Sequence, residues 1–183
     1  MEPKFTIQYG EYAVAQYLSK IKGASIFIPL SAQEKGIDLL IYKFINGNNK
    51  VQTVQVKMSG SYNIDKKYQN RLWFNRFEVQ DNADWFILVG IYPQFSSKYE
   101  SKVSDIAKWD EIMLVFTKDE MKQFMSELKQ KKTPDKPDTK FYFGFNDKTK
   151  IFRTRGYPQE RDMSEYLIEK RLIDIEKALE GEN

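Results

Sequence analysis

The stretch GIDLLIYKFINGNNKVQTVQVKM, residues 36–58, decides the fold of this chain. It consists of two apolar runs joined by the turn-forming residues 46–49. Glycine and asparagine tolerate the left-handed backbone that hairpin turns require, so the stretch predicts two antiparallel strands. Each strand carries one charged side chain in an apolar setting, Asp38 in the first and Lys57 in the second.

The register of this hairpin determines which polar groups meet. If Ile45 pairs with Lys50 across a four-residue turn, Asp38 lies opposite Lys57, and Gln55 takes the adjacent diagonal position. Side chains in these positions have Cβ atoms about 5 Å and about 7–8 Å apart, and alternation along the strands puts all three on one face. A carboxylate, an amide oxygen and an ammonium at this spacing can hold a divalent cation beside a phosphate, as in a nuclease.

A helix before the hairpin adds a second carboxylate. Apolar residues at i, i+4 and i+7 from Val14 predict a helix over residues 8–22 that ends at Gly23. Glu11 lies on the same inward stripe, in the expected first turn, where the helix dipole favours a negative charge. A carboxylate on a core-facing position is costly unless it is paired or bound to a metal. The alternative is a helix-end charge without a chemical role.

The composition restricts the chemistry. The 183 residues include 41% hydrophobic residues, enough to bury a core in one domain over residues 1–183, but no cysteine and no histidine. Zinc and haem are therefore not expected, and cysteine nucleophiles, Ser-His-Asp triads and histidine bases are excluded. Any metal must be held by oxygen ligands, which favours Mg²⁺, Mn²⁺ or Ca²⁺. Metal-assisted phosphodiester chemistry is one of the few routes that remain.

Charge and hydropathy bear on the partners. The net charge is only +3, so binding to nucleic acid would require a local basic face. The chain has no apolar run of about 18 residues and no N-terminal signal segment, which predicts a soluble, cytoplasmic protein without a membrane partner. The absence of cysteine agrees with a reducing compartment.

Basic residues interleaved with aromatic ones follow the Lys57 strand and recur near the C-terminal third. Such side chains can contact phosphates and stack on bases. The candidates are Lys66, Lys67, Arg71, Trp73, Arg76, Arg153 and Arg155. Arg153 and Arg155, two apart on an expected strand, should share a face. The alternative is a solvated loop whose aromatic residues turn into the core.

The rest of the chain predicts an α/β sandwich around a mixed sheet. Residues 73–79 suit either a strand or a short helix, and residues 131–140 form an expected loop. The other expected elements are strands at 24–30, 85–91 and 112–116, a helix from its cap at Thr117 to about Lys129, a hairpin over 141–155, and a last helix capped by Asp162.

Glu11 on a first helix, Gly36-Ile37-Asp38 opening a strand and Gln55-Val56-Lys57 on the next strand resemble the PD-(D/E)XK nuclease superfamily, in the Mrr-type form with Gln-x-Lys. The resemblance implies a restriction-endonuclease-like αβββαβ core, with a mixed central sheet flanked by helices. The core would cover about residues 8–92, followed by a C-terminal elaboration over about 93–183. It also implies a Mg²⁺-dependent (or Mn²⁺-dependent) endonuclease of restriction or repair type that acts on DNA.

The resemblance assigns roles by position. Asp38 would be the main metal ligand, Gln55 a second ligand and Lys57 the catalytic lysine. The backbone carbonyl of Val56 and the carboxylate of Glu11 would complete the metal shell. Gln55 stands where an acidic ligand is usual, so a catalytically inactive nucleic-acid-binding relative is one alternative. Another is a protein-interaction domain in which Asp38 and Lys57 form a plain ion pair. A homodimer would bring two active sites to two strands, whereas the last helix would alternatively only close the core.

Overall fold

The structure is a computed structural model, and its description covers residues 5–29, 35–60, 71–93, 109–128, 131–133, 136–137, 140–147, 150–155 and 161–181. The elements are α1 (Phe5–Leu18), β1 (Ala24–Phe27), β2 (Leu39–Ile45), β3 (Asn48–Gly60), β4 (Arg71–Asn75), β5 (Trp85–Pro93), β6 (Trp109–Thr117), α2 (Lys118–Glu127), β7 (Lys131–Thr133), β8 (Lys136–Pro137), β9 (Lys140–Asp147), β10 (Lys150–Arg155), β11 (Arg161–Asp162), the 3₁₀ turn η1 (Ser164–Tyr166) and α3 (Ile168–Glu180). None of the described helices is long and apolar enough to cross a membrane.

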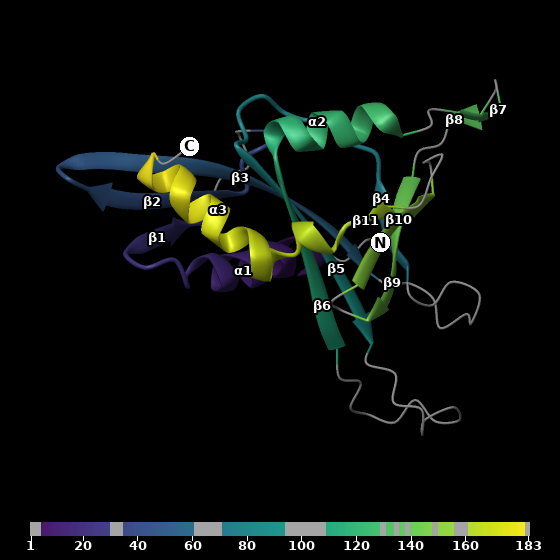
Figure 1. Cartoon of the computed structure of the whole chain (residues 1–183), viewed down its shortest axis with the longest axis horizontal. Coiled ribbons are helices and arrows are strands. Elements are labelled where there is room, and N and C mark those ends of the chain that lie inside the picture. Colours follow the sequence, from purple (N-terminus) through teal and green to yellow (C-terminus); the bar gives the residue numbers. More distant parts are fainter. Residues whose placement is uncertain are drawn as a thin grey trace.

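A five-stranded mixed sheet in the order β1-β2-β3-β5-β6 forms the centre of the fold. Strands β3 and β5 run parallel, and the other neighbours run antiparallel. Helices α1 and α3 lie beside the β1–β3 half of the structure, while a second sheet lies at the opposite end in Figure 1. The predicted fold class, α/β with a mixed central sheet flanked by helices, is confirmed.

The connection from β3 to β5 differs from the expected element order. A parallel pair requires a crossover, for which the αβββαβ order provides a helix. In the described part of this crossover the chain instead forms β4, which joins the second sheet, in the order β11-β10-β9-β4. Residues 131–140, expected as a loop, contribute the short paired strands β7 and β8.

The turn of the central hairpin is shorter than predicted. Asn46 and Gly47 both have positive φ, 50° and 79°, and Ile45 pairs with Asn48. This is a two-residue turn of the kind that suits twisted strands. The predicted pairing of Ile45 with Lys50 is therefore wrong, and the register moves by two residues. Because side chains alternate with a period of two, an even shift leaves each of them on its expected face.

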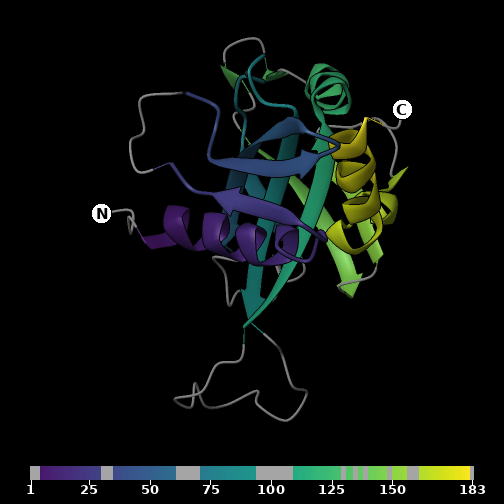
Figure 2. The same cartoon turned by 90° about the vertical axis from the view of Figure 1, so that its left-hand side faces the viewer.

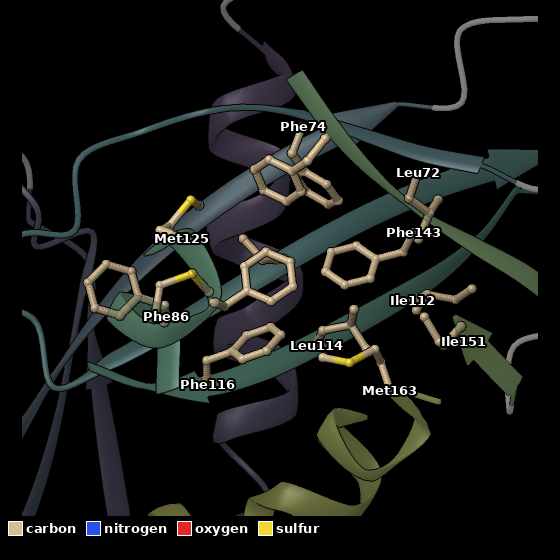
Figure 3. Packing of buried hydrophobic residues seen from close by; sticks show 14 of the residues in the cluster. Leu72, Phe74, Phe86, Ile112, Leu114, Phe116, Met125, Phe143, Ile151 and Met163 are labelled. Carbon is tan, nitrogen blue, oxygen red and sulfur yellow. The ribbon is translucent and has the colours of Figure 1, made fainter. Parts of the chain in front are cut away.

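Two apolar clusters occupy the two faces of the central sheet. On one face, α1 and α3 cover residues of β2, β3, β5 and β6, and Figure 2 shows the two helices against these strands. On the other face, α2 and the second sheet enclose an aromatic cluster that includes Phe86, Phe116 and Phe143 (Figure 3). The alternation of Leu39 and Ile41 into the first cluster sends Asp38 toward the opposite face of the sheet.

The helix ends differ in part from the predictions. The described part of α1 begins at Phe5, so Glu11 lies beyond the first turn, and the expected gain from the helix dipole does not apply there. At α2 the predicted cap at Thr117 is confirmed, and it forms a capping box, because Glu120 N donates to Thr117 Oγ1 at 3.2 Å and Thr117 N donates to Glu120 Oε2 at 2.8 Å.

Asp162 does not cap the last helix directly. Its Oδ1 accepts a hydrogen bond from the backbone N of Ser164, the first residue of η1, at 2.8 Å. Helix α3 begins only at Ile168, and it has no side-chain cap. An apolar stripe of α3 that includes Ile175 and Leu179 is buried against the central sheet.

Candidate functional site

The candidate site lies at the edge of β3 beyond the start of β2, where this edge of β3 has no partner among the described strands. Strand β2 starts at Leu39, opposite Val54, and no other described strand pairs with this edge of β3 beyond that point. Asp38 precedes the ladder, and its amide N donates to Val54 O at 2.9 Å. Its carboxylate Oδ2 accepts a hydrogen bond from Val56 N at 2.6 Å. The carboxylate thus takes the place of a partner strand, and this bond fixes it at the edge.

Backbone geometry adds a second oxygen to this edge. The N–H and C=O of one strand residue point to the same side, as the reciprocal bonds of an antiparallel pair require. Because Val56 N–H points to Asp38, the Val56 carbonyl oxygen faces the same open edge. The other carboxylate oxygen of Asp38, Oδ1, has no hydrogen bond in the described residues and could ligate a cation.

Gln55 lies next to Asp38 in the corrected register and on the same face. Its side chain is only 4% exposed. Its amide oxygen Oε1 is buried and has no hydrogen-bond partner among the described residues. An unsatisfied buried oxygen costs about 1–3 kcal/mol, so such an atom calls for a cation or an ordered water.

Lys57 lies on the same face, further along β3. The corrected register places it diagonal to Asp38, so the predicted directly opposed pair is wrong. Burial lowers the pKa of the Lys57 ammonium, and the negative charge of Asp38 opposes this shift. The two groups therefore interact through charge, but no salt bridge joins them in the part of the chain that the structure describes. The alternative of a direct Asp38–Lys57 ion pair is therefore not supported by the described contacts.

Glu11 approaches the site from α1 and is half-buried. Burial raises the pKa of its carboxyl group, and the negative charge of Asp38 raises it further. A bound cation near the two carboxylates would relieve this repulsion. No group of three Asp, Glu, His or Cys residues within the described ranges is arranged to hold a metal, so amide and carbonyl oxygens would have to contribute. An all-oxygen set of this kind fits Mg²⁺ or Mn²⁺.

Of the residues predicted to contact nucleic acid, the structure brings two together on one tyrosine and places another against α2. Lys66 and Lys67 lie outside the described residues. Arg71 and Trp73, on β4, both contact Tyr142 of β9: the Arg71 guanidinium carbon is 4.8 Å from the Tyr142 ring centroid, and the Trp73 and Tyr142 rings are 4.5 Å apart. Arg76 has a role within the fold, because its Nη2 donates to Met125 O of α2 at 3.3 Å.

Arg153 and Arg155 lie on β10, as the expected strand implies, and the pairing of β10 with β9 is irregular at these residues. A register shift in β10 lies between the two residues, which pair with Phe143 and Tyr142 respectively. The common face predicted for the two arginine side chains stays a prediction, because these side chains lie outside what the structure describes. Arg155 is the one that pairs with the tyrosine contacted by Arg71 and Trp73.

Phe77 belongs to the site although no sequence pattern indicated it. The Lys57 Nζ lies 5.4 Å from the centroid of its ring. The only available signal was an aromatic residue in the segment after β4, and the contact itself joins residues far apart along the chain.

This chain has the fold of a nuclease of known structure. The similar structure is that of the bacterial homing endonuclease I-Ssp6803I, with a TM-score of 0.53 and 15% sequence identity over 98% of this chain and 95% of that one. No protein-family model and no curated protein matches the chain. At this identity the likeness establishes the fold alone, and the assignment to the PD-(D/E)XK superfamily stays a prediction.

Proposed function

We propose that this chain is a metal-dependent endonuclease that hydrolyses phosphodiester bonds of DNA, of restriction or repair type. One observation carries the proposal: the side chain of Gln55, whose buried Oε1 has no hydrogen-bond partner in the described residues, comes from the position opposite Asp38 on the same face of the sheet, and the Asp38 carboxylate is fixed by Val56 N. The fold shared with a homing endonuclease supports the same function.

The metal would be Mg²⁺ or Mn²⁺, held by Asp38, the Gln55 side-chain oxygen and the Val56 carbonyl, with Glu11 as a direct or water-bridged ligand. When bound, such a cation polarises the phosphodiester and lowers the pKa of a water molecule. The protein supplies a rigid frame, because the Asp38 carboxylate is held by the Val56 amide and Gln55 is enclosed by the sheet.

Lys57 would bind the reacting phosphate. Its ammonium lies on the same face as Asp38 and Gln55, and it can donate hydrogen bonds to a non-bridging oxygen. In a partly buried site this contact offsets the charge that develops on the phosphate more strongly than it would in water. We assign contact with the flanking DNA to the Arg71–Trp73–Tyr142 cluster and Arg155, with Lys66 and Lys67 as further candidates.

Cleavage of plasmid DNA with Mg²⁺ or Mn²⁺ tests the proposal. Asp38→Asn and Lys57→Ala should each lower the rate at least about 100-fold, the usual cost of removing one preorganised electrostatic group. Glu165→Gln is the control, because the Glu165 side chain is 60% exposed and its ion pair is with Arg161. It should cut like the wild type. A folded Lys57→Ala protein that cuts at the wild-type rate overturns the assignment.

A second candidate function is DNA binding without cleavage. The observation that favours it is Gln55 itself, since an amide brings no negative charge to the metal. If the wild type binds an oligonucleotide duplex in the presence of a chelator and cuts nothing with Mn²⁺, while Gln55→Glu cuts, this candidate is preferred. Homodimerisation, a single domain over the whole chain and a cytoplasmic location stay predictions.

A further inference from the structure

We infer that the segment from Arg76 to Asn82 positions the side chains of Asp38 and Lys57 in the candidate site, and that Phe77 is the residue that orients Lys57. The segment follows β4 and leads to β5, with no helix or strand of its own. The inference deepens the proposed function and rests on it. In this reading Phe77 touches neither metal nor substrate and acts through Lys57.

Phe77 contacts Lys57 with the face of its ring. The Nζ of Lys57 is 5.4 Å from the ring centroid, within the range of a cation–π interaction. Without a salt-bridge partner in the described residues, the flexible lysine would otherwise sample many rotamers, at a considerable entropy cost when it is ordered. The ring restricts the ammonium to the side of β3 that carries Gln55 and Asp38.

The ring itself is held in place. It stacks on Phe86 at 6.2 Å with an interplanar angle of 15°, and Phe86 is fully buried in the aromatic cluster of Figure 3. The preceding residue, Arg76, donates a hydrogen bond to Met125 O of α2. Phe77 is therefore fixed by the core and in turn fixes the position of the Lys57 ammonium.

The other end of the segment fixes the turn before Asp38. Asn82 Nδ2 donates to Lys35 O at 2.8 Å, and Thr53 Oγ1 of β3 donates to Asn82 O at 2.8 Å. Gly36 has φ 93°, and a Cβ atom there would lie 2.6 Å from Gln80 Cβ. The turn thus lies directly against the segment, two residues from the carboxylate. One stretch of chain consequently sets the positions of both Asp38 and Lys57.

Phe77→Leu, Phe77→Tyr and the control Phe74→Leu test this inference. Phe74 belongs to the same aromatic cluster but stacks on Phe141, and in the described residues the ring contact of Lys57 is with Phe77 instead. In cleavage assays well below the unfolding temperature, Phe77→Leu should lower kcat about 3- to 30-fold, as expected for a lost cation–π contact, with KM for DNA unchanged. Phe77→Tyr should restore kcat, and Phe74→Leu should lower the unfolding temperature without lowering kcat.

A second measurement does not depend on activity. The ring current of Phe77 should shift the ε-CH₂ protons of Lys57 upfield in the NMR spectrum of lysine-labelled protein, with Lys57→Arg used for assignment. Phe77→Leu should abolish this shift, and Phe74→Leu should retain it.

The outcomes separate the two proposals. This shift pattern in a protein that cuts no DNA supports the position assigned to Lys57 and overturns the proposed nuclease function. A Lys57 resonance that is the same in the wild type and in Phe77→Leu overturns the inference. Equal loss of kcat in Phe77→Leu and Phe74→Leu also overturns it, because the effect would then be general to the core.

Discussion

Gly36→Ala should destabilise the protein more than any other glycine-to-alanine change in a described turn. Gly36 has φ 93°, a backbone conformation that costs a residue with a Cβ atom about 1–2 kcal/mol. The new Cβ would also lie 2.6 Å from Gln80 Cβ and 2.8 Å from Asn82 Oδ1, and overpacking of this kind costs about 1–3 kcal/mol. The sum is a loss of about 2–5 kcal/mol in the free energy of unfolding.

Gly47→Ala is the matched control. Gly47 also has positive φ, 79°, but a Cβ atom there would meet nothing within 4 Å. This variant should lose only the backbone part, about 1–2 kcal/mol. The effect of alanine on the unfolded chain is common to both variants and cancels in the comparison.

Urea unfolding followed by tryptophan fluorescence measures the difference. Gly36→Ala should unfold at a lower urea concentration than Gly47→Ala, with the same dependence on urea, and by about 1–3 kcal/mol in free energy. Equal stabilities would refute the close contact between the turn before Asp38 and the segment that contains Phe77.

Three further predictions concern other parts of the structure. Gln55→Leu should stabilise the metal-free protein by about 1 kcal/mol, because it removes a buried oxygen that has no hydrogen-bond partner in the described residues. It should also abolish the rise in unfolding temperature that Mn²⁺ gives the wild type. If Mn²⁺ does not raise the unfolding temperature of the wild type, the metal site is contradicted. Burial raises the pKa of Glu111 above its unfolded value, so its charged form destabilises the fold once the pH exceeds both values. Glu111→Gln should accordingly raise the unfolding temperature at pH 7 and have little effect at pH 3, and equal effects at both would refute this. Thr117→Ala should lower stability by about 1 kcal/mol through loss of the capping box, and an unchanged urea midpoint would count against it.

The faces of the central hairpin were predictable from sequence, but its register was not. The polar residues 46–49 allow either a four-residue loop or a two-residue turn at Asn46-Gly47, and the left-handed conformation of both residues selects the shorter one. The even shift kept Asp38, Gln55 and Lys57 on one face, so the proposed site survived an incorrect pairing.

Strand β4, in the crossover from β3 to β5, could have been predicted from the sequence. In β4, the buried Leu72 and Phe74 alternate with the half-buried Arg71 and Trp73, a period of two that is typical of a strand with one face on a core. The choice between strand and helix was left open for residues 73–79, and the alternation begins two residues earlier.

The contacts of Phe77 and Gly36 could not be predicted. Both depend on how the segment after β4 lies against strands and turns that are distant in sequence. Periodicity describes which face of an element is apolar, whereas these contacts depend on the path of an irregular segment with no period.

The hydrogen bond from Val56 N to Asp38 Oδ2 means that the same carboxylate would serve both catalysis and folding. Asp38→Ala would remove the hydrogen-bond acceptor of the Val56 amide, so the variant would be less stable as well as inactive. Asparagine keeps an oxygen at that point while discarding the charge. If the chain is the nuclease proposed above, this is therefore the substitution of choice for trapping an uncleaved complex.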